Sequence, residues 1–411
     1  MTGRWWLVFG IDSLNDIMNS ALDSNFNLES YWQRLQAARA VHRRESSSLY
    51  PGLEAFADAS TGNSINWQTG RQDLNAGLNA FYEIDLWGRL RTSVQAEEYR
   101  AGAAFSDYRA AAISLSSEVV ITWFSIAAAQ KQHEIISQQL RTNETMESLI
   151  MERFINGIVR SVDILRQRQL TEASRQQLAR ISAQEQMLQN RLKILSGRSP
   201  RTTRVIASLP SLPPMPETGI ALKLLNRRPD VQAAWLRLKA ADKDLTSAIR
   251  NRYPRLSLST ETAFRGDNIS NMFENWAYSL AANMLAPVFY AGELKAEADR
   301  NAAVKQQLLK DYRQALLTAY REVEDALLLE KQQLLIIESL DEQLALAEQS
   351  YGRLRSEYFN GLGNYLDVLT ALEELQKLQQ QQLTARQQLL EYRVGLYRAL
   401  AGGFETGRET R

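Results

Sequence analysis

The sequence contains one unit twice, and this duplication limits the folds that the chain can adopt. At an offset of 203, eight identical residues recur in order: Trp32, Arg34, Leu35, Ala37, Ala38, Tyr50, Pro51 and Leu53 match Trp235, Arg237, Leu238, Ala240, Ala241, Tyr253, Pro254 and Leu256. At an offset of 204, further matches join Gly88 to Gly292, Asn156-Gly157 to Asn360-Gly361, Asp163 to Asp367 and Leu165 to Leu369. Self-similarity at a fixed period indicates that the same supersecondary unit is built twice.

A proline-rich stretch separates the copies. Residues 198 to 218 hold five of the nine prolines. Prolines cannot donate backbone hydrogen bonds, and they keep a chain extended. The sequence therefore predicts a first repeat at 1–197, a linker at 198–218, a second repeat at 219–403 and a short tail at 404–411.

Each copy begins with a predicted helix of about 35 residues, at 14–48 and again at 219–251. Pro229 suits the first turn of the second of these helices, where its missing N–H is not needed. An alternating stretch follows. Apolar and polar side chains alternate along 74–86, as in a strand with two different faces, and a similar run covers about 277–290. The shorter runs 53–61 and 255–264 are expected to pair with these strands as hairpins.

After Gly88 and Gly292 the apolar period changes from 2 to about 3.5, which is typical of a coiled coil. Residues 88–153 and 292–357 then predict two helices of about 66 residues, each roughly 100 Å long at 1.5 Å per residue. Short breaks at 154–161 and 358–364 lead into return helices of about 35 residues, which end near Gly197 and Gly402. Each return helix covers half of a long helix, and the other 35-residue helix of the copy is expected to cover the rest.

Four strands cannot close into a β-barrel by themselves, because a closed barrel needs about eight strands. Several chains are therefore expected to contribute to one barrel. The strands are long enough to cross a bilayer, which takes about 9 to 11 residues at a tilt. Aromatic residues near the strand-to-helix glycines, Gly88 and Gly292, could form an interfacial girdle: Tyr82, Trp87, Phe289 and Tyr290. Ordinary packing on the sheet is the alternative role for these aromatic side chains.

Composition excludes several classes of protein. The 48 Lys and Arg nearly balance the 47 Asp and Glu, so no overall basic charge attracts nucleic acid. The chain has no cysteine, and only His42 and His133 supply imidazole, without ligand spacing, so we expect no metal site and no cofactor. No nucleophile elbow, phosphate-binding loop or zinc motif is present, so we expect no enzyme.

The N-terminal end raises a question of compartment. No run of 18 apolar residues predicts a membrane-spanning helix, and the first residues do not form a signal peptide. Either the protein is cytoplasmic or its targeting end is missing. Trp5 and Trp6 favour the second reading, because an exposed aromatic pair usually has something upstream or alongside to cover it.

These features together resemble the outer-membrane efflux channels of the TolC type, in the branch whose members are usually lipoproteins. Six stretches carry the resemblance, in chain order: YEIDLWGRLR at 82–91, the tip FINGIVRSVDIL from 154, LLNRRPDVQAA at 224–234, YPRLSLS at 253–259, APVFYAGELKAE at 286–297, and the tip FNGLGNYLDVL from 359. The branch has a lipid-bearing cysteine that this chain lacks, so we expect either a truncated chain or a non-lipidated member.

The resemblance implies an α+β membrane protein. It implies a homotrimer whose chains each give four strands to a twelve-stranded β-barrel, continued by a long α-helical barrel in the periplasm. It further implies that an inner-membrane pump of the resistance-nodulation-division type and a periplasmic adaptor protein pass drugs or other small solutes to this channel.

Two sets of site residues follow from the resemblance. The helix tips, with Asn156, Gly157, Asn360 and Gly361, would dock the adaptor. Asp367, and with less support Asp163, would line the pore constriction. Plain alternatives stay open, because Asn-Gly is ordinary turn chemistry and a carboxylate just after a turn caps a helix.

Two other functions are considered. A type I secretion component that exports proteins would have the same fold. A soluble coiled-coil scaffold would explain the Gln- and Leu-rich stretch at 377–392 but not the alternating strands.

Overall fold

The computed structural model describes residues 3–62, 71–199, 205–216, 227–400 and 403–409. It divides into two compact units, and each unit takes segments from both tandem copies. Unit 1 comprises Met1–Ser30, Arg109–Pro229 and Leu317–Arg411, and unit 2 comprises Tyr31–Tyr108 and Asp230–Leu316.

Two helices of equal length dominate the chain. Helices α3 (Arg89–Ile155) and α7 (Glu293–Phe359) have 67 residues each, and their bounds differ by the 204-residue offset of the repeat. At 1.5 Å per residue each is about 100 Å long. The return helices α4 (Ser161–Leu195) and α8 (Tyr365–Leu400) have 35 and 36 residues. The long helices and their half-length returns are therefore confirmed.

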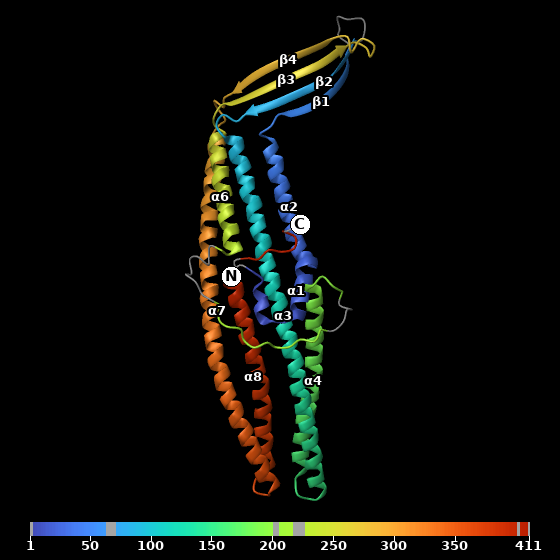
Figure 1. Cartoon of the computed structure of the whole chain (residues 1–411), viewed down its shortest axis with the longest axis vertical. Helices are drawn as coiled ribbons and strands as arrows, with labels where there is room; N and C mark the ends of the chain where they lie inside the picture. Colours follow the sequence, from blue (N-terminus) through green and yellow to red (C-terminus); the bar gives the residue numbers. More distant parts are fainter. Residues whose placement is uncertain (1–2, 63–70, 200–204, 217–226, 401–402, 410–411) are drawn as a thin grey trace. The chain divides into compact units, whose positions relative to one another are not determined.

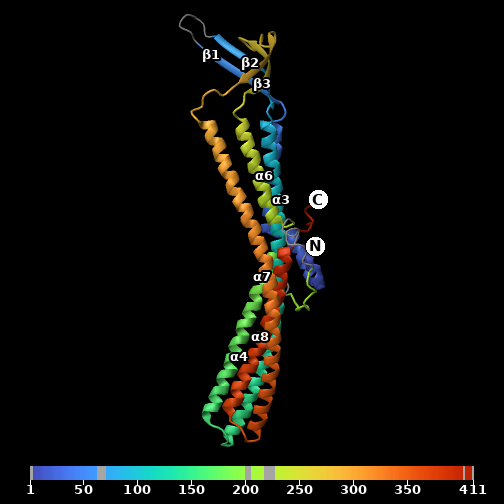
Figure 2. The same ribbon diagram turned by 90° about the vertical axis from the view of Figure 1, so that its left-hand side faces the viewer.

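In unit 1 these helices run side by side as two hairpins, α3 with α4 and α7 with α8 (Figures 1 and 2). Ala129, Ile136 and Ile181 join α3 to α4, and Ala326, Leu396 and Leu400 join α7 to α8. Amides connect the hairpins to each other. Gln139 Nε2 donates to the Gln376 carbonyl oxygen over 3.1 Å, and Gln376 Nε2 donates to Asn143 Oδ1 over 2.9 Å. The contact between the hairpins is therefore largely polar at this level.

The ends of the chain pack together in unit 1. The short 3₁₀ helix η1 (Trp5–Phe9) is buried there. The Trp5 ring stacks on Tyr397 with centroids 5.6 Å apart, and its Nε1 donates to Ser116 Oγ over 3.1 Å. The Trp6 ring meets Phe404 edge-on at 4.8 Å. The aromatic pair is thus covered from alongside, by other parts of the same chain.

The first predicted helix is interrupted, which corrects the expectation of one helix over 14–48. Helix α1 (Asp12–Ser24) ends before Asn25, and α2 (Phe26–Ser47) begins after it. Asn25 has an extended backbone, and its Oδ1 accepts the Leu28 N–H over 2.9 Å, as a helix N-cap does. Its Nδ2 donates to the Leu195 carbonyl oxygen over 3.0 Å. The asparagine starts a second helix instead of continuing the first.

The linker and the start of the second repeat are described in part. Residues 205–216 have neither helix nor strand, as expected of the proline-rich stretch, and residues 200–204 and 217–218 lie outside the described residues. Residues 219–226 of the helix predicted at 219–251 also lie outside the residues that the structure describes. Helix α6 (Pro229–Arg250) begins at the proline, as predicted.

The described strands of unit 2 form one antiparallel sheet in the order β1-β2-β3-β4 (Figure 1). They are β1 (Gly52–Gly62), β2 (Arg71–Ile84), β3 (Arg255–Gly266) and β4 (Trp276–Leu285). Both predicted hairpins are confirmed, and β2 also pairs with β3, which joins the two repeats. Strand β4 ends five residues earlier than expected, because Pro287 lacks the N–H that the ladder needs.

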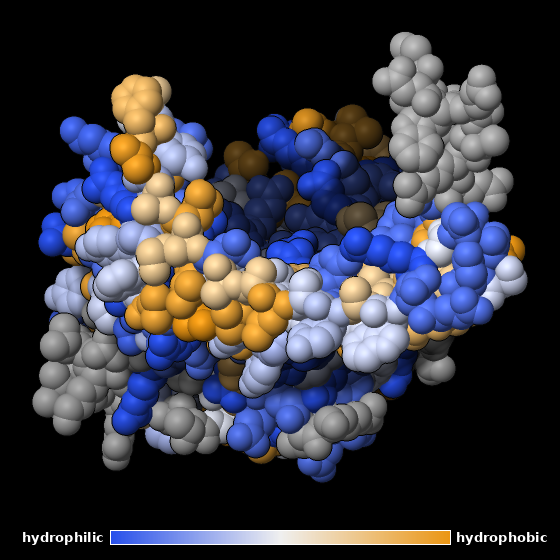
Figure 3. All heavy atoms as spheres, turned by 90° about the horizontal axis from the view of Figure 1, so that it is seen from above, coloured by the Kyte–Doolittle hydropathy of each residue, from blue (hydrophilic) through white to orange (hydrophobic). Residues whose placement is uncertain are grey.

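The register gives the whole sheet one apolar and one polar face. One row of partners runs Ala55, Leu78, Thr262, Tyr278, and the row beside it on the opposite face runs Glu54, Asn79, Glu261, Ser279. The large apolar side chains of the first face are open: Leu53 is 69% exposed, Tyr278 74% and Leu280 74%. Figure 3, which views the molecule from above, shows a patch of apolar side chains on the face toward the viewer. No described residue covers these side chains.

One helix among the described residues is apolar enough, by length and composition, to cross a membrane. It is α3, and 67% of its most apolar 18-residue window is buried inside the chain. The burial shows that this window is part of the helical core.

Candidate functional site

The first candidate site is the pair of turns that ends the helical hairpins. In the first turn the Ile158 N–H donates to the Arg153 carbonyl oxygen over 2.9 Å, and Gly157 has a φ of 73°. In the second turn the Leu362 N–H donates to the Glu357 carbonyl oxygen over 2.9 Å, and Gly361 has a φ of 82°. Both turns are Schellman motifs, which require a left-handed residue. Turn chemistry therefore accounts for both glycines.

The tips expose apolar side chains together with the Asn-Gly pairs. Asn156, Gly157, Asn360 and Gly361 are all exposed. Beside them Ile155 is 75% exposed, Ile158 61% and Leu362 80%. A cluster of exposed apolar residues at a turn is unusual, because turns are ordinarily polar. The structure thus brings all four predicted docking residues to an apolar surface.

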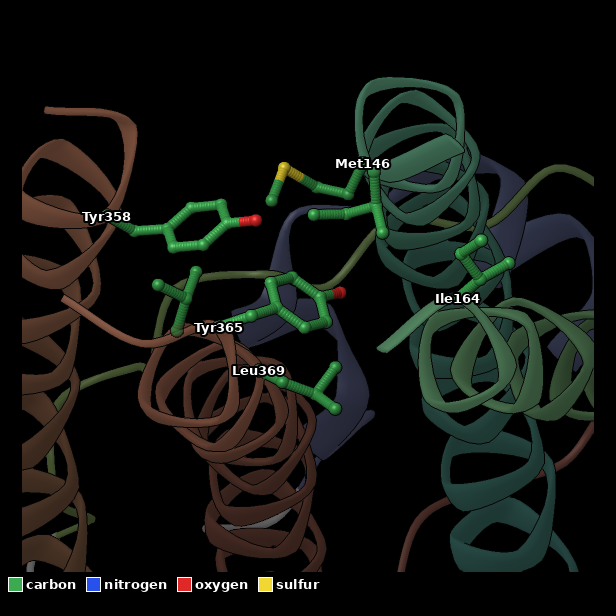
Figure 4. Close-up of a cluster of buried hydrophobic side chains, with 7 residues drawn as sticks. Met146, Ile164, Tyr358, Tyr365 and Leu369 are labelled. Atoms are coloured by element: carbon green, nitrogen blue, oxygen red, sulfur yellow. The ribbon is translucent and has the colours of Figure 1, made fainter. Parts of the chain in front are cut away.

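A buried cluster joins the four helices just behind the tips (Figure 4). Met146 comes from α3, Ile164 from α4, Tyr358 from α7, and Tyr365 and Leu369 from α8. The two tyrosine rings lie 5.6 Å apart, and the Tyr365 hydroxyl donates to Gln167 Oε1. Burial raises the pKa of both tyrosines above the ordinary value. The cluster keeps the ends of both hairpins at one level.

The two predicted pore carboxylates lie in different environments. Asp163 is only 5% exposed, and its Oδ2 accepts the Arg160 N–H over 3.3 Å. Its Oδ1 lies 3.5 Å from the Arg160 guanidinium. This carboxylate therefore caps α4, as one half of a capping box does. The burial of Asp163 favours the capping role that the sequence left open.

Asp367 has the same place in α8 but a free side chain. It is exposed, in the first turn of the helix. It makes no hydrogen bond or ion pair to any residue that the structure describes. Asn364 caps α8 in its place, since its Oδ1 accepts the Leu366 N–H over 2.6 Å. Sequence reasoning missed Asn364, although an asparagine directly before a helix is a signal for an N-cap.

The second candidate site is the transition from strand to helix in unit 2. At the first transition Asp85 accepts the backbone N–H groups of Leu90 over 3.1 Å and Arg91 over 2.9 Å, which caps α3. Burial opposes ionisation of this carboxyl, but these N–H groups and the Arg91 guanidinium outweigh it and hold the pKa of Asp85 below its ordinary value. Gly88 has a φ of 74°, and its carbonyl oxygen accepts Arg250 Nη1 over 2.8 Å.

The predicted aromatic residues lie around these transitions. Trp87 is 49% exposed, and its Nε1 donates to the Pro254 carbonyl oxygen over 2.7 Å. Tyr82 lies on the apolar face of β2. Phe289 is 84% exposed and Tyr290 47%, and both lie between β4 and Gly292 instead of within the strand. The aromatic residues thus gather near the transitions, but the two copies do not place them at matching positions.

The described residues contain no group of three or more His, Cys, Asp or Glu that could hold a metal ion. The buried ion pair of unit 1, Arg393 with Glu330, is used for structure. Its guanidinium also donates to the Pro213 carbonyl oxygen, so the pair ties the linker to α7 and α8.

Comparison with known proteins agrees with this geometry. The family model described as "Outer membrane efflux protein" matches residues 17–198 and again 221–402. The pyoverdine export outer membrane protein OpmQ of Pseudomonas aeruginosa is 30% identical, over 99% of this chain and 88% of its own. The toluene efflux pump outer membrane protein TtgF of Pseudomonas putida is 30% identical, over 98% of this chain and 86% of its own.

A solved structure of CusC, described in connection with transmembrane channel formation, superimposes on this chain with a TM-score of 0.91 and 26% sequence identity. The superposition covers 98% of this chain and 95% of the CusC chain. The predicted fold class, with four strands per chain and long helices in two tandem repeats, is confirmed, and so are the predicted outer-membrane location and the absence of enzymatic function. The chain belongs to the outer membrane efflux protein family and is an outer-membrane channel component of an efflux system.

Proposed function

We propose that three copies of this chain close a twelve-stranded barrel in the outer membrane and pass small solutes outward. Strand β4 of one copy pairs with β1 of the next, since each strand has one edge without a partner among the described residues. Unpaired edges are not tolerated inside a bilayer, so the sheet must close on other copies.

The two-faced sheet is the observation that carries this proposal. Its apolar face has open Leu, Tyr and Trp side chains, with Trp276 63% exposed. Its polar face carries Glu54, Glu261 and their neighbours in register. A lipid-facing surface and a water-filled interior account for the two faces. A soluble scaffold would leave the apolar face in water.

The assembly test is direct. Purified from outer membranes, the protein should have the native mass of three chains and conduct ions in a planar bilayer. A monomer that conducts nothing would overturn the proposal.

The tips are proposed to dock a periplasmic adaptor, with Asn156, Gly157, Asn360 and Gly361 at the contact. The exposed apolar side chains beside them support this role, because such a patch marks an interaction surface. The relatives are named as components of export and efflux systems, one of them of an efflux pump. An adaptor and an inner-membrane pump of the resistance-nodulation-division type complete the proposed path, and membrane lipid surrounds the barrel.

Asp367 is proposed to line the constriction of the pore. Its carboxylate is exposed and unpaired among the described residues, while Asp163 is engaged in capping α4. Three copies would then place one ring of three carboxylates just inside the tips. Such a ring attracts cations and repels anions at the entrance.

The cargo is proposed to be small solutes, such as drugs. The relatives are named for pyoverdine export, toluene efflux and cation efflux, which are small cargoes of different chemistry. Deletion of the gene should lower the concentrations of drugs, metals or solvents at which growth stops. If deletion instead left every tolerance unchanged and abolished secretion of a protein into the medium, the protein-export alternative would replace this proposal.

A further inference from the structure

A large open groove lies between the helices of unit 1. Its volume is about 770 Å³, and residues of α3, α4, α7 and α8 line it. This volume is typical of a site for a small molecule. Such sites are ordinarily lined by apolar side chains, but seven of the sixteen residues that line this groove are glutamines. The groove therefore offers amide groups where most sites of its size offer carbon.

The glutamines of the groove are of two kinds. Gln333 and Gln376 are buried and already bonded within the chain, to a carbonyl oxygen of α8 over 2.9 Å and to a side-chain oxygen of α3 over 2.9 Å. Gln132, Gln381 and Gln388 also line the groove, and their amides make no hydrogen bond to any residue that the structure describes. These three amides are free to bind a ligand.

The remaining lining residues define the chemistry of that ligand. A glutamine amide both donates and accepts hydrogen bonds and carries no charge. The charged lining residues are one cation and one anion, Lys377 and Glu373, and Lys377 Nζ already lies 3.2 Å from Glu374 Oε2. The larger apolar side chains of the groove are Leu170, Ile336 and Leu340. This lining fits a neutral solute with several hydroxyl or amide groups on a small apolar body.

The proline-rich linker lies on the other side of the same helices. Gln130 Oε1 of α3 accepts the Ala207 N–H over 3.0 Å, and Arg393 of α8 donates to the Pro213 carbonyl oxygen. The linker thus crosses from α3 to α8. Gln130 and Gln132 are two residues apart, so their side chains project about 200° apart around α3. The linker and the groove are therefore on nearly opposite sides of this helix.

Helix α8 shows the same division. Gln382 and Arg386 line a cavity of about 660 Å³ under the linker, whereas Thr384, two residues from each, lines the groove. In the proposed channel one side of these helices faces the lumen and the other faces outward. A linker inside the lumen would obstruct it. The linker side is therefore assigned to the outside and the glutamine-lined groove to the lumen.

We propose that the glutamine-lined groove is a binding site inside the lumen for neutral solutes that carry several hydroxyl or amide groups. Three copies would place three such grooves at one level. Neutral hydrogen bonds are individually weak, so a solute held there can also leave, as conduction requires. This inference rests on the proposed channel and names a class of solute that its lumen would hold.

Single-cysteine variants test the orientation of the groove, because the natural chain has no cysteine. The channel is placed in a planar bilayer, and a charged thiol-reactive reagent is added on the side to which the β-barrel opens. Modification of Gln381→Cys should lower the ion current. Ser208→Cys, which lines the cavity under the linker, is the control and should keep its current. If Gln381→Cys also kept its current, the groove would lie outside the lumen and the proposal would be overturned.

Maltotriose, a neutral sugar with many hydroxyl groups, is the probe for binding. It should block the ion current of the wild type at a measurable half-blocking concentration. Gln381→Leu/Gln388→Leu should raise this concentration at least about fivefold, because hydrogen bonds to the sugar are lost. The matched control is Gln176→Leu/Gln184→Leu, which changes two exposed glutamines of α4 outside the groove and should leave the concentration unchanged.

The outcomes separate failure of the site from failure of the channel. A wild-type protein without ion current would overturn the proposed channel itself. A conducting wild type that maltotriose blocks no better than the Gln381→Leu/Gln388→Leu variant would overturn the binding site and leave the channel standing. Polyethylene glycol of equal mass lacks the many hydroxyl donors of the sugar. Equal block by this polymer would show occlusion by volume alone and would also overturn the site.

Discussion

The two helix tips have the same backbone and use their carboxylates differently. Each turn is closed by a left-handed glycine, and each return helix carries an aspartate in its first turn. The difference begins three residues earlier, where Arg160 stands in the first copy and Asn364 in the second. Arginine has no oxygen to cap a helix, so Asp163 does so. Asparagine caps α8 itself and leaves Asp367 exposed.

The two strand-to-helix transitions differ in the same manner. In the first copy Asp85 caps α3, and Trp87 anchors to the turn before β3 through its Nε1. At the matching positions of the second copy stand Phe289 and Ala291. The second transition therefore exposes an aromatic ring where the first holds a carboxylate. Duplication has preserved the path of the backbone, while side chains beside each glycine have diverged.

The largest effect is expected at the second tip. Gly361→Trp should abolish crosslinking of the channel to its adaptor, because a bulky ring would occupy the docking surface. Gly361→Ala carries the same backbone strain at positive φ without the bulk, and Gly352→Trp carries the bulk in open space on α7 away from the turn. Both controls should keep crosslinking. Preserved crosslinking by Gly361→Trp would remove this turn from the contact.

Charge selectivity should distinguish the two aspartates. Asp367→Asn is expected to lower the cation-to-anion permeability ratio in planar bilayers by about twofold or more, because it removes a ring of negative charge. Asp163→Asn should leave the ratio unchanged, since that carboxylate is buried at the cap. Equal ratios for Asp367→Asn and the wild type would place Asp367 outside the constriction.

For the stability of the helix tips, substitution of Asp163 should have a larger effect than substitution of Asp367. Asp163→Ala and Asn364→Ala each remove a cap and should cost about 1 kcal/mol, whereas Asp367→Ala should cost less than about 0.5 kcal/mol. Hydrogen exchange of tip peptides measures this locally, at the Arg160 N–H in the first tip and the Leu366 N–H in the second. Faster exchange in the Asp367→Ala tip than in the Asn364→Ala tip would contradict the assignment of the caps.

The smallest effect concerns pH at the first transition. The folded pKa of Asp85 is lowered, so its stabilisation of α3 is present above the ordinary value of 3.8 and is lost as pH falls through the lowered value. Asp85→Asn should be less stable than the wild type at neutral pH by less than about 1 kcal/mol. The difference in melting temperature should vanish on acidification. A difference that persists or grows at low pH would rule out this contribution.

Much of the architecture can be predicted from the sequence because it depends on the spacing of repeated and apolar residues. The 204-residue offset and the change of period at Gly88 and Gly292 predict the long helices and both tips. The helix caps and the end of one strand were predicted less completely. Asn25 and Asn364 are N-caps that a closer search for capping residues could have found, and Pro287 marks where β4 must end.

Burial could not be read from the sequence in the same way. Asp163 and Asp367 occupy the same position of the repeat, and only the packing of the folded chain distinguishes them.

The pairing of β2 with β3 has a consequence for synthesis. Leu74 meets Gly266, and Ile84 meets Leu256, so the central ladder joins residues 172 to 192 positions apart. Each outer hairpin can form as soon as it is made, but the middle of the sheet must wait until the second copy has emerged. During that interval the edge of β2 that will pair with β3 is open, and such an edge can pair with another nascent chain.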